Sequence, residues 1–317
     1  MSDVKFCVGI DVSGAVLDYG CWPDGPKGQC VNNEEGISRL VDICGRLGPD
    51  LIVMEASGGL EMPLAAGLQD AGLPVFVANP KRVRDFIRST GQLAKTDRID
   101  PAGIAHYASQ THVEARSVPD AGQRKLKALV TRRNQIRDQI TAEKSRLART
   151  AQPDARRDIR DHLRWLEGRL KKMEKRIADH IKADAEMSRK KAILQSVPGV
   201  AEATSNSILS EMPELGQLDR KKITALAGLA PFARDSGTFK GKRTIGGGRA
   251  ALRRALYMAA LVATRHNPVI MRQYRRLTDM GKQKKTALVA CMRKLLLILN
   301  NMLRNNSKWN QFLPQNP

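Results

Sequence analysis

The first third of the chain alternates short apolar runs with stretches of helical periodicity. Two β-rich runs across a turn at Ser13 and Gly14 predict a β-hairpin over residues 4–20. Apolar runs at residues 51–54 and 75–78 predict strands that are buried on both faces. This alternation predicts an α/β domain with some parallel strand pairing. Helices are expected over residues 37–47, 64–71, 82–91 and 99–109.

The middle of the chain carries an apolar seam with alternating spacings of three and four residues. Its first arm covers residues 126–147 and its second arm covers residues 159–177. Pro153 lies between the arms and should interrupt the helix, because proline cannot continue a helical hydrogen-bond ladder. The spacing fits an antiparallel hairpin within one chain and an intermolecular coiled coil equally well.

The last third is predicted to be mostly helical. A Pro-Gly turn at residues 196–200 separates two helical stretches, and long helices are expected over residues 250–265 and 284–303. Residues 226–248 are rich in glycine and basic side chains, which predicts a loop or short extended elements. No pattern follows residue 305, so a frayed terminus is expected.

Charge is distributed unevenly along the 317 residues, whose net charge is +22. Residues 1–110 hold 10 basic and 14 acidic residues and are net −4. Residues 111–190 are net +10 and residues 191–317 are net +16. A mildly acidic first third followed by a strongly basic remainder indicates a polyanionic partner, for which nucleic acid is the expectation.

Several classes of protein are not expected. A membrane protein is disfavoured, because no apolar run reaches the length needed to span a bilayer and the basic residues do not oppose an aromatic stripe. The first residues lack the apolar core of a secretory signal. The five cysteines have no CxxC spacing, so neither a disulfide framework nor a zinc site is indicated. A reducing, cytoplasmic location is therefore expected.

Four carboxylates occupy positions that suit metal binding. Asp11 ends the first strand and Glu55 ends the buried strand, where functional groups gather in open α/β sheets. Asp97 and Asp100 are three residues apart at the start of a predicted helix and should project to one face. Oxygen ligands suit Mg²⁺ or Mn²⁺, and two such ions can clamp a phosphodiester. Each acid alone also fits a turn or helix cap, so the hypothesis depends on their combination.

Two motifs in the basic part of the chain suit phosphate groups. Pro198 and Gly199 resemble the hairpin of helix-hairpin-helix DNA-binding proteins, which presents backbone N–H groups to phosphate; an ordinary interhelical turn fits them too. Ser236 lies in the glycine-rich basic loop, where a turn is the ordinary role of a Ser-Gly pair and cations would be needed to activate the hydroxyl. The basic side chains expected to contact nucleic acid are Lys240, Lys242, Arg243, Arg249, Arg253 and Arg254.

Eight short motifs occur in order along nearly the whole chain. The first four are Gly9-Ile10-Asp11-Val12-Ser13, Met54-Glu55-Ala56-Ser57-Gly58, Ala78-Asn79-Pro80 and Lys95-Thr96-Asp97-Arg98-Ile99-Asp100. The others are Val197-Pro198-Gly199-Val200, Ala227-Gly228-Leu229-Ala230-Pro231, Asp235-Ser236-Gly237 and Leu252-Arg253-Arg254-Ala255-Leu256. Jointly they resemble the insertion-sequence-110 family of DEDD transposases and the related Piv-type DNA invertases. The sequence departs from the family at Pro101, where Ala is usual, and proline is compatible with the first turn of a helix.

The resemblance implies a domain organisation and a set of partners. It implies an RNase-H-like, RuvC-like domain over residues 1–112 and a coiled-coil helical region over residues 113–188. A mostly α-helical C-terminal domain with a helix-hairpin-helix follows over residues 189–317. The implied partners are double-stranded donor and target DNA and a structured guide RNA from the same element. The implied assembly is a dimer that joins into a tetramer, with active sites shared between protomers.

The resemblance also implies the chemistry. Asp11, Glu55, Asp97 and Asp100 would bind Mg²⁺ or Mn²⁺, and Ser236 would be the nucleophile that forms a covalent link to DNA. Two other functions remain open. A metal-dependent junction resolvase would use the acids without the serine, and a non-enzymatic nucleic-acid-binding protein would explain the charge but not the acids. An actin-like sugar kinase is disfavoured, because a second phosphate-binding loop is missing from the sequence.

Overall fold

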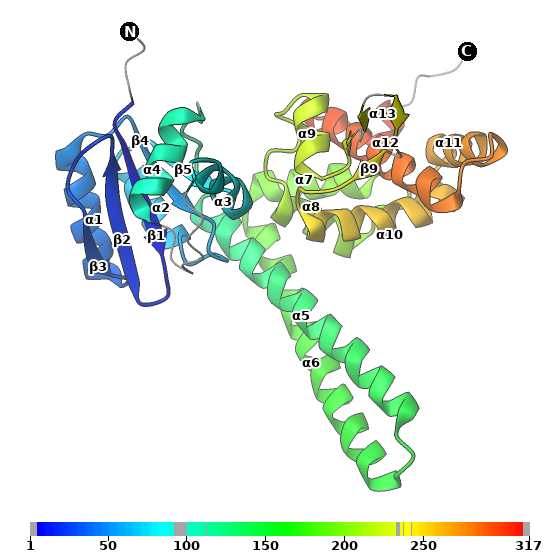
Figure 1. Cartoon of the computed structure of the whole chain (residues 1–317). Helices are drawn as coiled ribbons and strands as arrows, with labels where there is room; N and C mark the ends of the chain where they lie inside the picture. Colours follow the sequence, from blue (N-terminus) through cyan, green and yellow to red (C-terminus); the bar gives the residue numbers. More distant parts are fainter. Residues whose placement is uncertain are drawn as a thin grey trace. The chain divides into compact units, whose positions relative to one another are not determined.

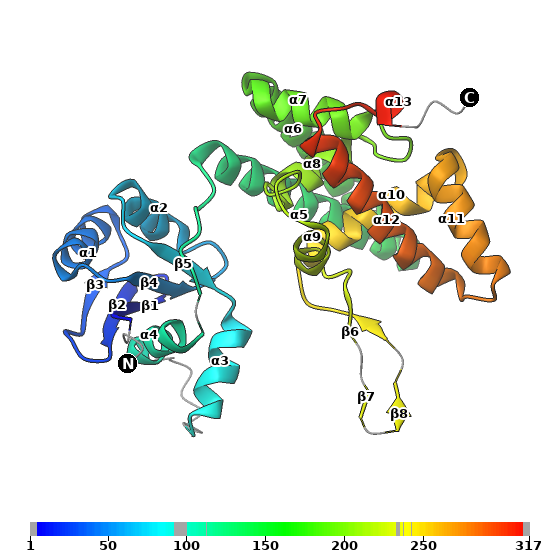
Figure 2. The same cartoon turned by 90° about the horizontal axis from the view of Figure 1, so that it is seen from above.

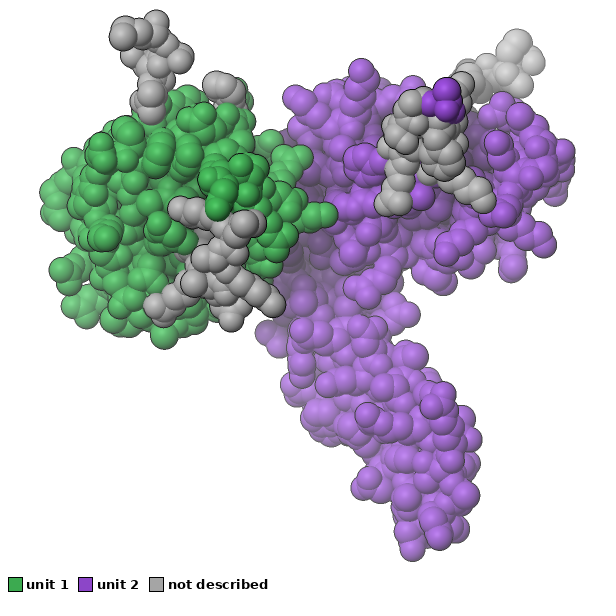
Figure 3. Space-filling model, in the orientation of Figure 1, with its two compact units in different colours: residues 1–120 green, residues 121–317 purple. Residues whose placement is uncertain are grey.

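The structure is a computed structural model, and it divides the chain into two compact units, residues 1–120 and 121–317, which Figure 3 draws in different colours. Each unit has a hydrophobic core of its own and is described separately. At residues 235–236, 239–240 and 311–312 the structure describes the backbone but not the side chains. The residues described are 5–91, 100–111, 113–232, 235–236, 238–241 and 243–312.

A five-stranded mixed sheet forms the centre of the first unit. The strands β1, β2 and β3 pair antiparallel, whereas β4 and β5 run parallel to β1, in the spatial order β3-β2-β1-β4-β5. The predicted hairpin and the two predicted buried strands are confirmed, and β3 is an addition that the sequence pattern did not indicate. The bounds are β1 (Cys7–Val12), β2 (Val16–Trp22), β3 (Gly28–Val31), β4 (Leu51–Glu55) and β5 (Val75–Ala78).

Helices cover both faces of this sheet (Figures 1 and 2). The helices α1 (Glu34–Leu47) and α2 (Met62–Asp70) pack against the face that carries the even-numbered residues of β1 and β4. The helices α3 (Pro80–Ser89) and α4 (Pro101–Gln110) pack against the face that carries the odd-numbered residues. A mixed sheet between helices confirms the predicted α/β class. Its strand order and directions are those of the RNase-H-like fold that the resemblance implies.

The helix α4 lies so close to the sheet that two facing glycines are required beneath it. Gly9 of β1 and Gly20 of β2 are direct partners in the antiparallel pair. A Cβ atom on Gly9 would lie 2.0 Å from the Pro101 carbonyl oxygen, and one on Gly20 would lie 3.1 Å from the Ala102 backbone nitrogen. This contact holds the N-terminus of α4 above β1, two residue pairs away from Asp11.

Two long helices, α5 (Ala121–Arg149) and α6 (Pro153–Ala183), form an antiparallel hairpin in the second unit (Figure 1). The first helix ends before Pro153, as predicted. The ion pairs Arg133–Glu174 (3.0 Å) and His162–Glu143 (3.5 Å) cross between the two helices. The two arms therefore pack within one chain, and pairing between protomers stays a prediction. The buried residues of the seam are Leu126, Leu129, Ile136, Ile140, Leu163, Leu166, Met173 and Ile177.

The base of this hairpin shares one hydrophobic core with the helices that follow. The helix α12 is long and apolar enough to span a membrane, with mean hydropathy 1.4, but 61% of that stretch is buried in the unit, as expected of a core helix. The expected frayed terminus is wrong for Trp309, which is buried and whose backbone N–H donates to Ser196 Oγ at 2.9 Å. The bounds are α7 (Ala185–Gln195), α8 (Glu202–Glu211), α9 (Arg220–Leu226), α10 (Ala250–His266), α11 (Pro268–Asp279), α12 (Lys284–Arg304) and α13 (Trp309–Phe312).

Two small ribbons connect α9 to α10, which confirms the short extended elements predicted for this segment. In the first ribbon β6 (Pro231–Phe232) pairs with β9 (Thr244–Ile245), and in the second β7 (Asp235–Ser236) pairs with β8 (Phe239–Lys240). Figure 2 shows these strands extending away from the helices of the second unit.

Candidate active site

Two of the predicted acids lie side by side at one edge of the sheet. The parallel strands β1 and β4 are in register with Ile10 beside Met54, so Asp11 and Glu55 are the next residues along these neighbouring strands. Side chains alternate between the faces of a strand, and Ile10 and Met54 belong to the α1–α2 face. Asp11 and Glu55 therefore project from the opposite face, where α4 packs.

The Glu55 carboxylate is buried and incompletely paired. Its residue is 7% exposed, and its Oε1 atom has no hydrogen-bond partner among the described residues. Burial raises the pKa of Glu55 from 4.5 to about 7, a change that the charge of Arg84 opposes and the charge of Asp11 increases. An unpaired buried carboxylate oxygen is costly, which marks this position as one where a cation would be stabilising.

A second buried acid, Glu61, fixes the loop after β4. Its Oε2 atom accepts hydrogen bonds from the backbone N–H groups of Ser57 and Gly59, both at 2.9 Å. Ser57 Oγ in turn donates to the Glu55 carbonyl oxygen at 3.2 Å. Sequence reasoning missed Glu61, although an acid six residues after Glu55 at the start of a helix was a visible signal. Glu61 positions the chain that carries Glu55.

Asp100 is the N-cap of α4 and not one of its helical residues. Its Oδ1 atom accepts from the Ala102 N–H at 3.1 Å, and Pro101 begins the helix. The expectation that Asp100 lies within the helix predicted over residues 99–109 is therefore wrong, because the helix begins two residues later, at Pro101. Asp97 lies outside the described residues. The close contact of α4 with Gly9 brings the Asp100 end of the helix to the sheet face of Asp11.

A cation accompanies these acids. Arg84 of α3 is exposed, and its positive charge opposes the rise in the pKa of Glu55. The helix α3 follows β5 directly and starts from the same edge of the sheet, with Asn79 as its N-cap. Sequence reasoning did not single out Arg84; the signal available was the basic run Lys81-Arg82-Val83-Arg84 after a buried strand.

Asp11, Glu55 and Asp100 are the described acids that could hold a divalent cation. Carboxylate oxygens are the donors that Mg²⁺ and Mn²⁺ prefer, and the unpartnered Glu55 Oε1 beside Asp11 suits such an ion. Among the residues that the structure describes, no three His, Cys, Asp or Glu side chains are grouped closely enough to hold a metal ion. The fourth acid, Asp97, is not among them. The oxygen donors of Glu55 and Asp11 suit a divalent metal ion, although the described residues alone do not make up a complete metal site.

The predicted nucleophile lies in the second unit. Ser236 is the last residue of β7 and pairs with Phe239 across the ribbon. Four arginines follow this segment in sequence: the exposed Arg243 and Arg254, and Arg249 and Arg253. Lys240 is described by its backbone alone, and Lys242 lies outside the described residues.

Arg249 and Arg253 make internal contacts. The Arg249 guanidinium forms a bidentate pair with Glu214 at 2.6 and 2.7 Å and donates to the Glu211 carbonyl oxygen at 2.7 Å. Arg253 donates to the Gly247 carbonyl oxygen. Both hold the segment onto the helices, a role that competes with nucleic-acid binding.

The Pro-Gly turn is packed against α10. Gly199 has φ +101°, and a Cβ atom there would lie 2.9 Å from the Ala263 backbone nitrogen. The Asn267 side chain donates to the Pro198 carbonyl oxygen at 3.4 Å. Ala201 is the N-cap of α8 and provides no side-chain cap, so the first N–H groups of α8 remain available to another acceptor.

Comparison with known proteins identifies the family. Residues 8–152 match an IS110 DEDD family described as "Transposase", and residues 191–275 match "Transposase IS116/IS110/IS902 family". The chain belongs to the IS110 family of transposases. As a member of this family it is an enzyme of DNA recombination, and its DEDD acids imply dependence on a divalent metal ion.

Two named relatives and one solved structure are similar to parts of this IS110-family transposase. The pilin gene-inverting protein of Moraxella bovis is 26% identical over 80% of each chain. An uncharacterized 42 kDa protein of insertion element IS900 from Mycobacterium paratuberculosis is 35% identical over 36% of this chain and 30% of its own length. The Thermus thermophilus RuvC structure aligns with 34% of this transposase and 92% of its own chain, with 17% identity and a TM-score of 0.25.

Proposed function

We propose that this transposase cuts and rejoins donor and target DNA through a covalent link between DNA and Ser236. Asp11, Glu55, Asp97 and Asp100 would hold Mg²⁺ or Mn²⁺. The observation that carries the proposal is the buried Glu55 carboxylate, which has an unpartnered oxygen and lies beside Asp11, in a chain whose two matched segments both belong to transposases.

The covalent step exchanges one phosphodiester bond for another and therefore needs no external energy source. The Ser236 hydroxyl oxygen attacks a DNA phosphorus, the bond from phosphorus to the 3′ oxygen breaks, and the 3′ oxygen leaves with a proton while the hydroxyl proton is lost to solvent or a base. The product is a serine phosphodiester and a free 3′ hydroxyl. Rejoining is the reverse attack by a 3′ hydroxyl, which releases the serine. The phosphodiester bond energy is conserved, in keeping with a sequence that lacks a Walker-type phosphate loop.

The acids and basic side chains have separate parts in this proposal. When bound, a divalent metal ion supplies positive charge to the phosphoryl group and its leaving oxygen. Glu61 holds the loop that follows Glu55, and Asp100 is fixed by its capping hydrogen bond, so both acids are pre-positioned. Arg84 adds a cation beside the acids that could contact a DNA phosphate.

Nucleic acid is the proposed partner of the basic second unit. Its last 127 residues are net +16, which supports contacts with donor and target DNA and with a structured guide RNA. The turn at Pro198 and Gly199, with the uncapped start of α8, would act as a helix-hairpin-helix phosphate site. The basic residues Lys240, Lys242, Arg243, Arg249, Arg253 and Arg254 would line the path of the strand to Ser236. Assembly as a dimer and tetramer, with the hairpin of α5 and α6 as a coiled-coil contact, completes the proposal.

The test is a plasmid recombination assay with Ser236→Ala. The variant should lose recombination while retaining nucleic-acid affinity, because it loses one oxygen and no charge. Ser207→Ala is the matched control, since the Ser207 hydroxyl donates to Ala203 of its own helix and should be dispensable. Wild-type recombination by Ser236→Ala would contradict serine catalysis.

A second candidate function is a metal-dependent junction resolvase that uses the acids alone. The observation that favours it is that the acids Asp11, Glu55 and Asp100 all lie in the first unit, on a face that α4 covers. In that case Ser236→Ala would cleave branched DNA normally, and Asp11→Asn would not.

Sequencing of RNA that copurifies with the wild-type protein tests the proposed guide RNA. One dominant structured RNA supports the guide, and nonspecific RNA fragments contradict it.

A further inference from the structure

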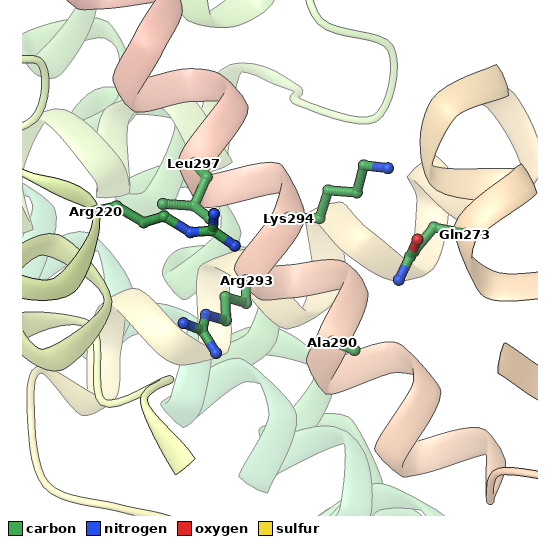
Figure 4. A pocket seen from close by; sticks show the side chains of 6 residues that line it. All are labelled: Arg220, Gln273, Ala290, Arg293, Lys294 and Leu297. Atoms are coloured by element: carbon green, nitrogen blue, oxygen red, sulfur yellow. The ribbon is translucent and has the colours of Figure 1, made fainter.

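A basic pocket of about 370 Å³ lies among three helices of the second unit, and its lining includes neither Ser236 nor the predicted acids. Figure 4 shows Arg220 entering from α9, Gln273 from α11, and the other side chains from α12. Its volume is within the range of roughly 300–1,000 Å³ typical of small-ligand sites. The lining residues are Arg220, Gln273, Ala290, Arg293, Lys294 and Leu297.

The polar lining of this pocket is entirely cationic or neutral. Arg220, Arg293 and Lys294 line it, and no ion pair joins any of them to an acid among the residues described. Arg276 is not part of the lining but donates to Oε1 of the lining residue Gln273 at 3.3 Å. Three like charges on one pocket repel one another unless an anion is present.

Arg293 is half-buried and has one donor atom without a partner among the described residues. Arg293 Nε is inaccessible to solvent and has no hydrogen-bond partner in the described part of the chain. A buried, unpaired donor on a charged group costs about 1–3 kcal/mol or more. Guanidinium groups match phosphate oxygens in a two-pronged geometry, so the guanidinium groups of Arg220 and Arg293 suit a phosphate bound in the pocket.

The remaining lining is apolar. Ala290 and Leu297 flank Arg293 and Lys294 on the same helix. A free inorganic anion would gain nothing from these two side chains, whereas a nucleotide can place its phosphate on the cations and its sugar or base against the apolar wall.

We propose that this pocket binds one phosphodiester-linked nucleotide of a nucleic-acid strand, as an anchor point separate from the cutting site. The inference rests on the proposed function in that it takes nucleic acid as the partner. DNA and RNA share the phosphodiester chemistry that the pocket recognises, and the arms of the experiment separate them.

The experiment measures binding and not recombination. The triple variant Arg220→Gln, Arg293→Gln and Lys294→Gln is compared with the wild-type chain by fluorescence anisotropy. The probes are a 24-nucleotide single-stranded RNA, the single-stranded DNA of the same sequence, and the DNA duplex, in 50–200 mM salt. We expect at least a 10-fold loss of affinity for the bound probe and a salt dependence shallower by about two contacts, at roughly 0.7–0.9 per phosphate contact.

A matched control removes the same charge elsewhere. The variant Lys171→Gln, Lys172→Gln and Lys175→Gln loses three exposed cations from α6 and should change affinity less than threefold. Arg293→Lys keeps the charge but loses the two-pronged geometry, so it should lose part of the affinity at unchanged salt slope. A loss confined to RNA assigns the anchor to the guide, and a loss confined to DNA assigns it to the recombining strand.

A photocrosslink locates the strand without removing any cation. With p-benzoylphenylalanine at Gln273, irradiation should join the bound probe to α11, and mass spectrometry should find one nucleotide attached there. The pocket proposal alone would be overturned in two cases in which the wild-type chain binds a probe. In the first, the triple variant and the control variant lose the same amount of affinity. In the second, irradiation gives no crosslink from position 273. A wild-type chain that binds none of the probes would overturn the pocket proposal together with the proposed nucleic-acid partner.

Discussion

The sheet that carries the acids and the ribbon that carries Ser236 are built in opposite ways. In the first unit, Asp11 and Glu55 extend from strands whose neighbouring residues are fully buried, and α4 is pressed onto the sheet over Gly9. In the second unit, Ser236 lies on the two-residue strand β7, which pairs with the two-residue strand β8. The two regions also differ in charge, since residues 1–110 are net −4 and residues 191–317 are net +16.

This difference fits two different chemical tasks. Metal-binding carboxylates need fixed positions, because like charges held together are stable only at a defined separation from a cation. A nucleophile that must reach a DNA phosphate and later release it is served by a peripheral element surrounded by positive charge. Variants that damage one region and spare the other therefore test two expectations. The two regions should fold independently, and both should be needed for catalysis.

The largest effect is expected from Asp11→Asn. Loss of one carboxylate should lower recombination by at least about 1,000-fold, or roughly 4 kcal/mol of barrier, while nucleic-acid binding by the second unit is unchanged. Recombination is measured on plasmids, and folding by circular dichroism. Asp42→Asn, at an exposed position of α1 on the opposite sheet face, is the control and should remain active. Equal activity of the two variants would remove Asp11 from the site.

The next largest effect concerns the hairpin of the second unit. Leu166 is 1% exposed in the seam, so Leu166→Asp buries an unpaired charge and should destabilise this unit by at least about 3–5 kcal/mol. The neighbouring Trp165 is 58% exposed, and Trp165→Asp should be close to neutral. Thermal unfolding should show a lowered transition for Leu166→Asp alone. Light scattering on the same samples reports whether the oligomeric mass falls with it.

A smaller and more local effect is expected from Gly9→Ala. The added Cβ would displace the Pro101 carbonyl oxygen and push α4, with its Asp100 cap, away from Asp11. We expect a cost of about 1–3 kcal/mol in stability and a loss of recombination larger than this destabilisation explains. Gly14→Ala is matched to it, because a Cβ on Gly14 would have no atom within 4 Å. Normal metal-dependent activity of Gly9→Ala would show that the position of α4 is unimportant.

The smallest effect is a pH dependence of stability. The pKa of Glu55 is raised to about 7 in the folded protein, so the folded chain binds the proton more tightly than the unfolded chain. Stability from this group is therefore greatest below about pH 4.5 and falls as the pH rises toward 7. Glu55→Gln should remove this slope and raise Tm at pH 8 in EDTA, by roughly 4 °C for each kcal/mol relieved.

Two controls accompany that measurement. Glu114→Gln, an exposed position, should keep the wild-type slope. Added Mg²⁺ should raise the Tm of the wild-type chain at pH 8 and leave Glu55→Gln nearly unaffected. The interpretation fails when wild type and Glu55→Gln have parallel curves between pH 5 and 8.

Much of the fold followed from local patterns in the sequence. The apolar runs of β4 and β5 and the seam of α5 and α6 were predicted, because burial on both faces or along one helical stripe leaves a regular pattern. The strand β3 was missed, since its four residues Gly28–Val31 contain glycine and glutamine and present a single buried side chain. The helix α11 was missed because its strongly basic sequence, Pro268–Asp279, has only one buried residue, Ile270.

The site was predictable in residue type but not in its supports. The positions of Asp11 and Glu55 followed from strand ends, which are local features. Arg84 and Glu61 were not found, because a basic run after a strand and an acid at a helix start do not by themselves show which side chain acts on Glu55 or on the loop after it. Asp100 was assigned to the helix itself because sequence periodicity does not fix a helix start to one residue.

The covalent link at Ser236 is the central claim, and a denaturing gel tests it most directly. Wild-type protein is incubated with end-labelled donor DNA, copurified RNA and Mg²⁺, and the reaction is stopped in detergent. The account predicts a protein-linked DNA band for the wild type, absent from Ser236→Ala, with mass spectrometry placing the phosphate on Ser236. A band that persists in Ser236→Ala, or a phosphate on another residue, would contradict it.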